Sequence, residues 1–577
     1  MDLKQSKEPD VAKSAAVDPP KRQSLVPLLV VLAVALGLRL WGIGWGLSSS
    51  RHYFSYHPDE NAVLFYAMNG NGINIFSGKL LPGFYNYGSL QLYLINFTNS
   101  VVYLLGGVAK IVPTAIDFPR EYDSWGRMLL VGRLIAASMG VWTVGLTYAI
   151  GRRLWNERAG LIAALLLAVM PLHAQHSHWL VVDVPTTFWI MLAVYWSTRL
   201  MELQDSDYAA LSPWKRIRPA LLAGLAAGFA CATKYNAALA LLPVLHATLP
   251  ARRGTSTGPS TKQAMVWTGT ALAAFVLAFL VGCPGSVLDS KQFIHDVGFE
   301  AKHVSAQADE PFQQTGSGFV FHVATNLFYG MGWPLLLIAL GSLVFAGIRR
   351  ERSDGLLAVF AVPYYALIGF AVVRYARYAI PLLPILALWS GRMLDALWSS
   401  AKLSTSRAGI ALTVATVAST AAYAVYYIAP MSKVDPRDQA STWIEQHGLG
   451  GQTIAFATMP WFQTASVDPA FGWFMRGGWK QLPYNPPGYE SRFIYAGDWD
   501  STIFDSQKPQ VVVLSQYEYK DAVRLHRPDA LTFLVRLKKD YTPAAEFGGY
   551  GKADIGPNGP PHDMMYDNPA TWVFVRR

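Results

Sequence analysis

Two carboxylic acids stand side by side in the segment Tyr56–Asn61, directly after a proline. Asp59 and Glu60 follow Pro58, and a proline in the first turn followed by acids is typical of a helix N-terminus, where the helix dipole favours negative charge. Adjacent residues on a helix diverge by about 100°, so one carboxylate can face a substrate while its neighbour anchors the loop. The alternative is that both acids only start a short interfacial helix.

A third acid, Asp183, ends a stretch that contains the histidines His173, His176 and His178. It precedes an apolar run and, by the span order given below, lies on the same membrane face as Asp59. Histidines three residues apart on a helix can hold one metal ion, which makes His173, His176 and Asp183 a possible divalent-metal site. The alternative is that the histidines form hydrogen bonds in an aromatic interface, so a metal is not required.

Three basic residues stand where apolar runs are interrupted or end. Lys234 divides an otherwise continuous apolar stretch, and Arg374 and Arg377 flank Tyr375-Ala376 at the outer end of another run. Cations on the outer face are unusual, and arginine forks and lysine charges suit a phosphate group. The alternative for each residue is contact with ordinary lipid headgroups.

An aromatic segment, Pro82–Leu90, leads into an apolar helix and predicts an aromatic surface on the membrane. We expect its Tyr85 and Tyr87, together with His57 and His178, to line a substrate site. A carboxylate can take a proton from an acceptor hydroxyl, and cations can stabilise a departing phosphate. Because nucleotides are absent outside the cell, an activated donor there has to be carried on a lipid.

Charged residues make up only 15% of the chain, against about 25% in soluble proteins, which favours a membrane protein. We therefore expect membrane-spanning helices to position the residues described above. Apolar runs of about 15–25 residues recur up to residue 429 and predict about eleven spans. The first, Val26 to Leu47, is too long for a cleavable leader and is interpreted as a signal anchor. The others lie near 128–150, 159–173, 184–203, 219–232, 236–250, 265–283, 321–347, 355–373, 378–398 and 408–429.

Basic residues between these spans predict the orientation. Clusters around residues 152–158, 215–218, 252–262, 349–352 and 402–407 fall on the same side as Lys21 and Arg22 of the polar tail 1–22, which we expect to be disordered. The positive-inside rule places this side, and the N-terminus, in the cytoplasm of a multi-pass plasma-membrane protein. The net charge, 48 − 38 = +10, therefore reflects topology and does not indicate nucleic-acid binding.

The chain divides into a membrane domain (23–429) and a C-terminal domain (430–577). An odd number of spans places the first long loop (48–127) and the C-terminal domain outside the cell. Helix-like Pro436 to His447 precedes strand-like Thr453–Thr458, Val511–Leu514 and Trp572–Val575, which predicts a small extracytoplasmic α/β domain. Its Pro/Gly-rich middle, Leu482–Tyr489, predicts long loops. Only two cysteines occur, so a disulfide framework is excluded.

These residues, in this order, resemble the GT-C superfamily, and within it the polyprenol-phosphate-dependent glycosyltransferases near protein O-mannosyltransferases (glycosyltransferase family 39) and aminoarabinose transferases. The resemblance covers about Leu25 to Leu397 and rests on His57-Pro58-Asp59-Glu60, Tyr85–Leu90, Asp183-Val184-Pro185, Thr233-Lys234-Tyr235 and Arg377–Pro384. The chain has no Trp-Trp-Asp signature, which argues against an oligosaccharyltransferase catalytic subunit.

The resemblance implies that Asp59 is the general base, that Asp183 supports the site, and that transfer from a polyprenyl-phosphate sugar inverts the anomeric centre. It also implies that Lys234, Arg374 and Arg377 bind the donor phosphate. Glu60 is expected to position Asp59 or to hold a cation. The acceptor is a protein, a glycan or a lipid of the cell envelope. Two alternatives stay open: a transporter or flippase, and a non-catalytic scaffold that binds lipid-linked sugar.

Overall fold

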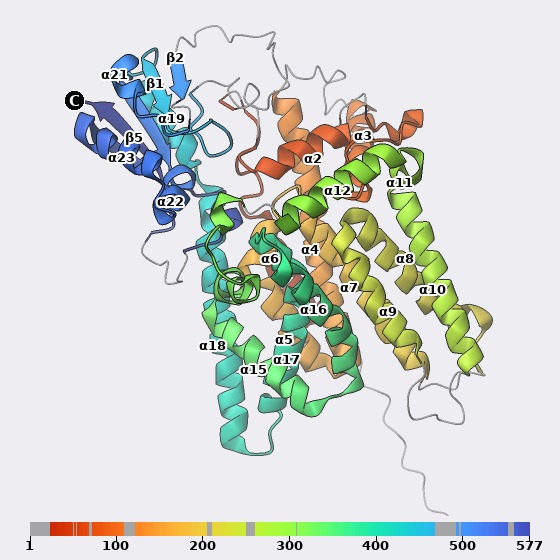
Figure 1. Cartoon of the computed structure of the whole chain (residues 1–577). Helices are drawn as coiled ribbons and strands as arrows, with labels where there is room; N and C mark the ends of the chain where they lie inside the picture. Colours follow the sequence, from red (N-terminus) through yellow and green to blue (C-terminus); the bar gives the residue numbers. More distant parts are fainter. Residues whose placement is uncertain are drawn as a thin grey trace, which may run out of the picture.

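The computed structural model describes residues 24–49, 51–52, 55–68, 72–108, 122–204, 210–249, 260–306, 309–467, 492–495, 498–551 and 559–577. The predicted tail 1–22 and the Pro/Gly-rich segment Leu482–Tyr489 lie outside these residues, as do parts of the first loop. Within the described residues, a bundle of helices carries a small α/β domain at one end (Figure 1).

The predicted spans fall on helices of the bundle: α1 Val26–Leu40, α4 Tyr122–Leu154, α5 Glu157–Ala168, α7 Asp183–Gln204, α8 Pro213–Thr233, α9 Leu241–Thr248, α10 Thr261–Gly282, α15 Trp333–Arg349, α16 Arg352–Phe370, α17 Leu383–Trp398 and α18 Leu403–Ile428. Among the described residues, 5 helical stretches are both long and apolar enough to cross a membrane, and α1 and α15 are shorter apolar helices. The chain is therefore a mostly helical multi-pass membrane protein, while the number of spans stays a prediction.

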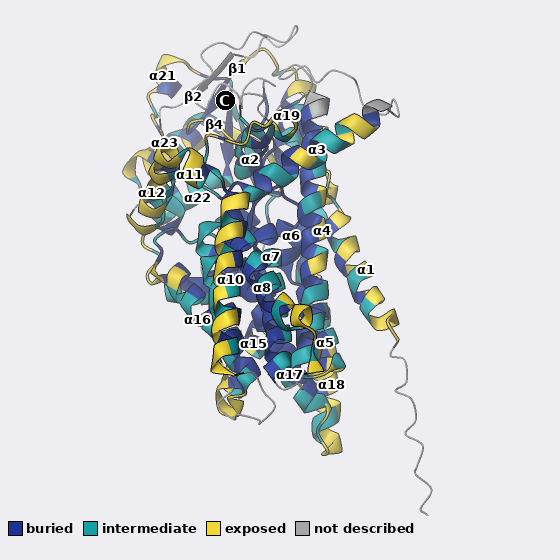
Figure 2. Ribbon diagram, turned by 90° about the vertical axis from the view of Figure 1, so that its right-hand side faces the viewer, coloured by how far each residue is buried: buried dark blue, intermediate teal, exposed yellow. Residues whose placement is uncertain are grey.

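Small residues allow the central helices to pack closely, as is usual where van der Waals contact holds membrane helices together. A Cβ on Gly160 of α5 would lie 2.6 Å from the Tyr148 carbonyl oxygen of α4, and a Cβ on Gly391 of α17 would lie 2.7 Å from the Ala159 carbonyl oxygen. Figure 2 shows that α5, α6 (Pro171–His176), α7 and α8 are mostly buried, whereas α10 exposes one face.

One predicted span is broken in the structure, and a second break lies between two predicted spans, at Lys234. The run 321–347 begins with α13 (Gly318–Phe321), a π-helical turn (His322–Leu327) and α14 (Phe328–Met331), and it breaks at Gly332 before α15. Gly332 has a φ of 78°, a left-handed conformation that favours glycine, and the next residue but one is a proline. The second break separates α8 from a 3₁₀ helix (Tyr235–Ala240) and α9, with Lys234 in extended conformation between them.

A layer of helices crosses the end of the bundle that faces the α/β domain (Figure 1). It consists of α2 (Pro58–Met68), the 3₁₀ turn η1 (Ile75–Ser77), α3 (Leu90–Val108), α11 (Gly285–Leu288) and α12 (Ser290–Ala306). Apolar side chains of α12, such as Ile294 and Phe299, are exposed. An amphipathic helix in this position suits a membrane–water interface.

The C-terminal domain contains a five-stranded sheet in the order β2-β1-β3-β5-β4. The predicted helix and strands are confirmed as α19 (Pro436–Gln446), β1 (Thr453–Phe456), β3 (Val511–Ser515) and β5 (Thr571–Arg576). Strands β2 (Arg492–Tyr495) and β4 (Tyr541–Phe547) complete the sheet; β2 and β3 pair with β1 in parallel, and β5 pairs antiparallel with β3 and β4. Helices α21 (Ile503–Ser506), α22 (Gln516–Arg524) and α23 (Pro528–Asp540) accompany the sheet.

Polar contacts fix this domain on the bundle. Asp435 accepts a hydrogen bond from Trp45 Nε1 (3.0 Å), and Asp438 accepts one from the Tyr56 hydroxyl (2.7 Å). The buried carboxylate of Asp567 accepts hydrogen bonds through Oδ1 from the Tyr550 hydroxyl (2.6 Å) and from Gln175 Nε2 of α6 (3.1 Å). Side chains from the loop before α2 and from α6 therefore orient the domain over the same end of the bundle.

The Asp567 contact predicts a pH-dependent stability. Burial raises the pKa of Asp567 from its ordinary value of 3.8 to about 7. The folded state therefore favours the protonated carboxyl, and stability falls as the pH rises from about 4 to about 7, by at most about 1.4 kcal/mol per pH unit. We expect Asp567→Asn to remove this part of the slope, measured as the thermal unfolding midpoint in detergent across that range.

The matched control is Asp500→Asn, an exposed acid of the same domain. It should leave the pH dependence of the unfolding midpoint as in the wild type. Equal slopes for Asp567→Asn and the wild type would contradict the prediction.

Candidate functional site

The start of α2 directs the two adjacent acids to different environments. Pro58 is the first residue of α2, and the Asp59 backbone N–H donates to His57 Nδ1 at 3.2 Å. The Asp59 side chain remains 25% exposed, whereas Glu60 is completely buried. The division expected from the helical spacing is present: Asp59 faces outward and Glu60 points into the protein.

Glu60 anchors the loop through a buried ion pair with Arg133 of α4. Its two carboxylate oxygens accept from Arg133 at 2.8 and 2.7 Å, and from the Leu180 backbone N–H at 2.7 Å. The Ser55 hydroxyl also donates to it. Burial alone would raise the pKa of Glu60, but the Arg133 charge and hydrogen bonds lower it overall. The carboxylate therefore stays ionised and fully partnered, which suits an anchor.

The third acid, Asp183, begins α7 and pairs with Lys234. Lys234 Nζ lies 2.7 Å from Asp183 Oδ1, and the two side chains are 16% and 5% exposed. The break after α8 releases Lys234 from the helix, so its side chain can reach the end of α7. Gly88 packs directly beneath this break, where a Cβ would lie 1.9 Å from the Ala232 carbonyl oxygen. Only a glycine allows the aromatic loop to approach the break so closely.

Arg377 pairs with Asp59 close to the Asp183–Lys234 pair. Its Nη2 lies 3.2 Å from Asp59 Oδ2, and its guanidinium carbon lies 5.9 Å from the centre of the Tyr378 ring. Lys234 Nζ lies 4.7 Å from that ring. Two acid–cation pairs, one from each of the acidic segments, therefore meet around Tyr378.

A cavity of about 500 Å³ opens beside Lys234 and Tyr378. Its polar side includes Asn86, Tyr87, Lys234, Asn236 and Glu300. Its apolar side comes from α12, α16 and the residue that follows α16: Val297, Ala301, Val304, Leu367, Ile368, Phe370 and Ala371. A cavity with a charged end and an apolar wall at the edge of the bundle suits a molecule that has a polar head and a hydrocarbon chain.

Only part of the expected substrate lining reaches this cavity. Tyr87 lines it, but Tyr85 is buried, with its hydroxyl donating to Asp289 at 3.1 Å and its backbone N–H donating to Asp296 at 2.9 Å. His57 is buried between the rings of Trp179 (4.6 Å between ring centres) and Tyr566 (4.7 Å).

His178 and Arg374 also face other partners. The His178 ring nitrogens contact the carbonyl oxygens of Ala174 (2.9 Å) and Trp41 (3.0 Å). The Arg374 guanidinium donates to the Thr315 hydroxyl at 2.6 Å, so it is not brought together with Lys234 and Arg377.

The described residues contain no group of three or more His, Cys, Asp or Glu side chains that could hold a metal ion. His173 Nδ1 instead lies 2.7 Å from an Arg39 guanidinium nitrogen. His176 lies against the Trp179 ring, with 4.6 Å between ring centres. The suggested ligand set His173, His176 and Asp183 therefore does not converge.

Sequence reasoning missed three residues around the site. Arg133 lies inside a predicted span with no local signal of its partner. Glu300 stands on α12, which no predicted span includes, and it lines the cavity. Asp563 of the C-terminal domain lies 3.6 Å from Arg377. Each approaches the site through tertiary contacts with a distant segment.

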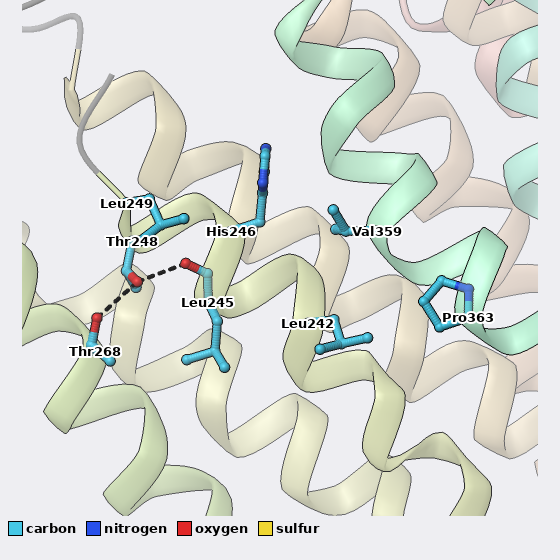
Figure 3. Close-up of a pocket in the computed structure, with 8 residues that line it drawn as sticks. All are labelled: Leu242, Leu245, His246, Thr248, Leu249, Thr268, Val359 and Pro363. Carbon is cyan, nitrogen blue, oxygen red and sulfur yellow. Dashed lines mark hydrogen bonds between the residues drawn. The ribbon is translucent and has the colours of Figure 1, made fainter. Parts of the chain in front are cut away.

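A second cavity, of about 570 Å³, lies between α9, α10 and α16 (Figure 3). Its lining is largely apolar, with His246 and the hydrogen-bonded pair Thr248 and Thr268 as the polar groups. None of the acidic or basic residues considered above lines it. The cavity beside Lys234 is therefore the better candidate for chemistry.

Comparison with protein families gives a match to the dolichyl-phosphate-mannose-protein mannosyltransferase family over residues 102–282. No curated protein sequence matches the chain. The fold is similar to that of the archaeal oligosaccharyltransferase AglB from Archaeoglobus fulgidus, solved with an inhibitory peptide and a dolichol-phosphate. That match has a TM-score of 0.51 and 14% identity over 94% of this chain and 77% of the other.

The fold is also similar to that of ArnT from Cupriavidus metallidurans, solved with undecaprenyl phosphate bound. The TM-score is 0.50 and the identity 15%, over 96% of this chain and 98% of that chain. These similarities support the fold, and the family match covers the segment that contains Asp183 and Lys234. Together they show a fold similar to that of AglB and ArnT and a match to the mannosyltransferase family model over less than half of the chain.

Proposed function

We propose that this protein moves a sugar from a polyprenyl-phosphate carrier to an acceptor hydroxyl at the outer face of the membrane. The observation that carries the proposal is the meeting of the Asp59–Arg377 and Asp183–Lys234 pairs around Tyr378, beside a cavity with an apolar wall. The carrier phosphate would lie at the charged end, and the first part of the isoprenoid chain would lie against α12 and α16.

Asp59 is the proposed general base. It is the more exposed of the two adjacent acids, and its only ion pair among the described residues is with Arg377. A carboxylate at this position can take the proton from the acceptor hydroxyl as that oxygen attacks the sugar. Asp183 is more deeply buried and already paired with Lys234, so its proposed role is to hold the lysine.

Lys234 is the proposed phosphate ligand, because it lines the cavity. Its ammonium group is a compact charge that can stabilise the negative charge of the departing phosphate. Arg377 does not line the cavity; it orients Asp59 and adds to the positive potential there. We assign no phosphate contact to Arg374, whose guanidinium faces Thr315.

Transfer by this arrangement would invert the anomeric centre. One base activates the acceptor, the phosphate leaves from the opposite side of the sugar, and a phosphate needs no protonation to depart. The oxygen–carbon bond to the acceptor forms as the bond from the sugar to the phosphate oxygen breaks. The fold does not determine which sugar is transferred. It also does not determine the acceptor, which can be a protein, a glycan or a lipid.

The proposal predicts that Asp59→Asn abolishes transfer but keeps donor binding. Turnover should fall by roughly 100-fold or more, because the base is lost while the carrier contacts remain. The measurement incubates the purified protein with a panel of labelled polyprenyl-phosphate sugars and membrane extract, and it follows the labelled product. Asp500→Asn is the control and should transfer normally; full activity of Asp59→Asn would refute the proposed mechanism.

A second prediction concerns the donor phosphate. Lys234→Gln should weaken binding of a polyprenyl phosphate by roughly tenfold or more, because a charge-assisted contact is lost. The double variant Asp183→Asn/Lys234→Gln avoids leaving a buried carboxylate unpaired and should show the same loss. Lipid binding can be measured with a labelled polyprenyl phosphate in detergent.

Lys302→Gln is the matched control for Lys234. Lys302 is exposed on α12 and does not line the cavity, so its loss removes the same charge nearby without removing the contact. Equal binding losses in Lys302→Gln and Lys234→Gln would show a general electrostatic effect and would contradict the assignment.

A further inference from the structure

Asp563 is a buried acid of the C-terminal domain that reaches the candidate site. It belongs to the short 3₁₀ helix η8 (His562–Met564), and its side chain is completely buried. Its Oδ1 accepts the backbone N–H of Ala376 at 2.9 Å, and its Oδ2 accepts the backbone N–H of Arg377 at 2.9 Å. Oδ2 also lies 3.6 Å from Arg377 Nη1. One carboxylate therefore accepts both backbone N–H groups and lies close to the Arg377 guanidinium, whose Nη1 forms no hydrogen bond to the described residues.

These contacts supply hydrogen-bond acceptors for buried backbone N–H groups of the membrane domain. Ala376 and Arg377 open the 3₁₀ helix η6 (Ala376–Leu382) that leads into α17. The first N–H groups of a helix have no partner within it and must find an acceptor elsewhere when they are buried. The residue before η6, Tyr375, provides no side-chain cap. The acceptor comes instead from a segment more than 180 residues away in the chain.

Arg377 consequently lies between two carboxylates. Asp59 is 3.2 Å from its Nη2, and Asp563 is 3.6 Å from its Nη1. The guanidinium also stacks near the Tyr375 ring, with 3.9 Å from its carbon to the ring centre. Asp563 fixes the backbone of Arg377, and the two carboxylates and the Tyr375 ring limit the positions open to the guanidinium that pairs with Asp59.

We propose that Asp563 is a positioning residue for the transfer reaction, which acts through Arg377 to hold Asp59 in place. The inference rests on the function proposed above. It also means that the candidate site is complete only when the C-terminal domain is docked, because the domain supplies the carboxylate that caps η6.

The test is the variant Asp563→Asn in the full-length protein. The Asn oxygen can accept only one of the two backbone N–H groups, and its amide donates where the other N–H and Arg377 require an acceptor. We expect kcat for sugar transfer to fall by roughly 10- to 100-fold, because small displacements of a catalytic group are costly. The donor KM should change by less than about threefold, since Lys234 and the cavity are untouched.

Asp500→Asn is the matched control, because Asp500 is an exposed acid of the same domain whose side chain bonds locally to Thr502. It should transfer within about twofold of the wild type. If Asp563→Asn matches Asp500→Asn while Asp59→Asn is inactive, the positioning role is refuted and the proposed function stands. If Asp59→Asn retains full activity, the proposed function itself fails.

A double-mutant cycle separates positioning from simple docking. In an Arg377→Lys background, Asp563→Asn should cost little further kcat, because the proposed effect of Asp563 reaches Asp59 only through the Arg377 guanidinium. Additive losses would show that Asp563 acts independently of Arg377 and would overturn the proposal. Asp563→Ser repeats the measurement without burying an amide donor; if neither variant folds, Asp563 serves fold stability and the proposal is also overturned.

Discussion

A charged side chain buried in a helix bundle must find an opposite charge or a set of hydrogen bonds, and this constraint organises the structure. Glu60 meets Arg133, Asp183 meets Lys234, and Arg377 meets two carboxylates. An uncompensated buried charge costs several kcal/mol, on the order of the effect of losing a large core side chain. The helices can therefore assemble only in arrangements that bring these partners together.

The adjacent acids Asp59 and Glu60 show how one constraint yields two roles. Glu60 is fully buried and its oxygens are occupied by Arg133, Ser55 and Leu180, so it fixes the first turn of α2. Asp59, one residue earlier, is placed on the exposed side of the same turn. The anchored neighbour makes the position of the exposed carboxylate reproducible, as the proposed role of general base requires.

The C-terminal domain is part of the same arrangement. Its contacts with Trp45, Tyr56 and Gln175 orient it over the end of the bundle, and Asp563 then caps the turn that carries Arg377. The domain in this way contributes to the geometry of a site whose other charged groups belong to the membrane helices. These contacts are the basis of the proposed dependence of sugar transfer on domain docking.

The sequence alone indicated the helical membrane architecture, because long apolar runs can satisfy their backbone only as helices in a bilayer. It also indicated the strands β1, β3 and β5, the helix start at Pro58, and the acids and cations at Asp59, Asp183, Lys234 and Arg377, since those signals are local. The tertiary structure decided which charges pair. The sequence around Arg133, Glu300 and Asp563 does not indicate which residues they contact. It also does not indicate that Arg374, Tyr85 and His178 contact groups outside the candidate site. Which charges pair depends on how helices far apart in the sequence and a separate domain pack together. The residue pattern along one segment carries no information about which other segment packs against it.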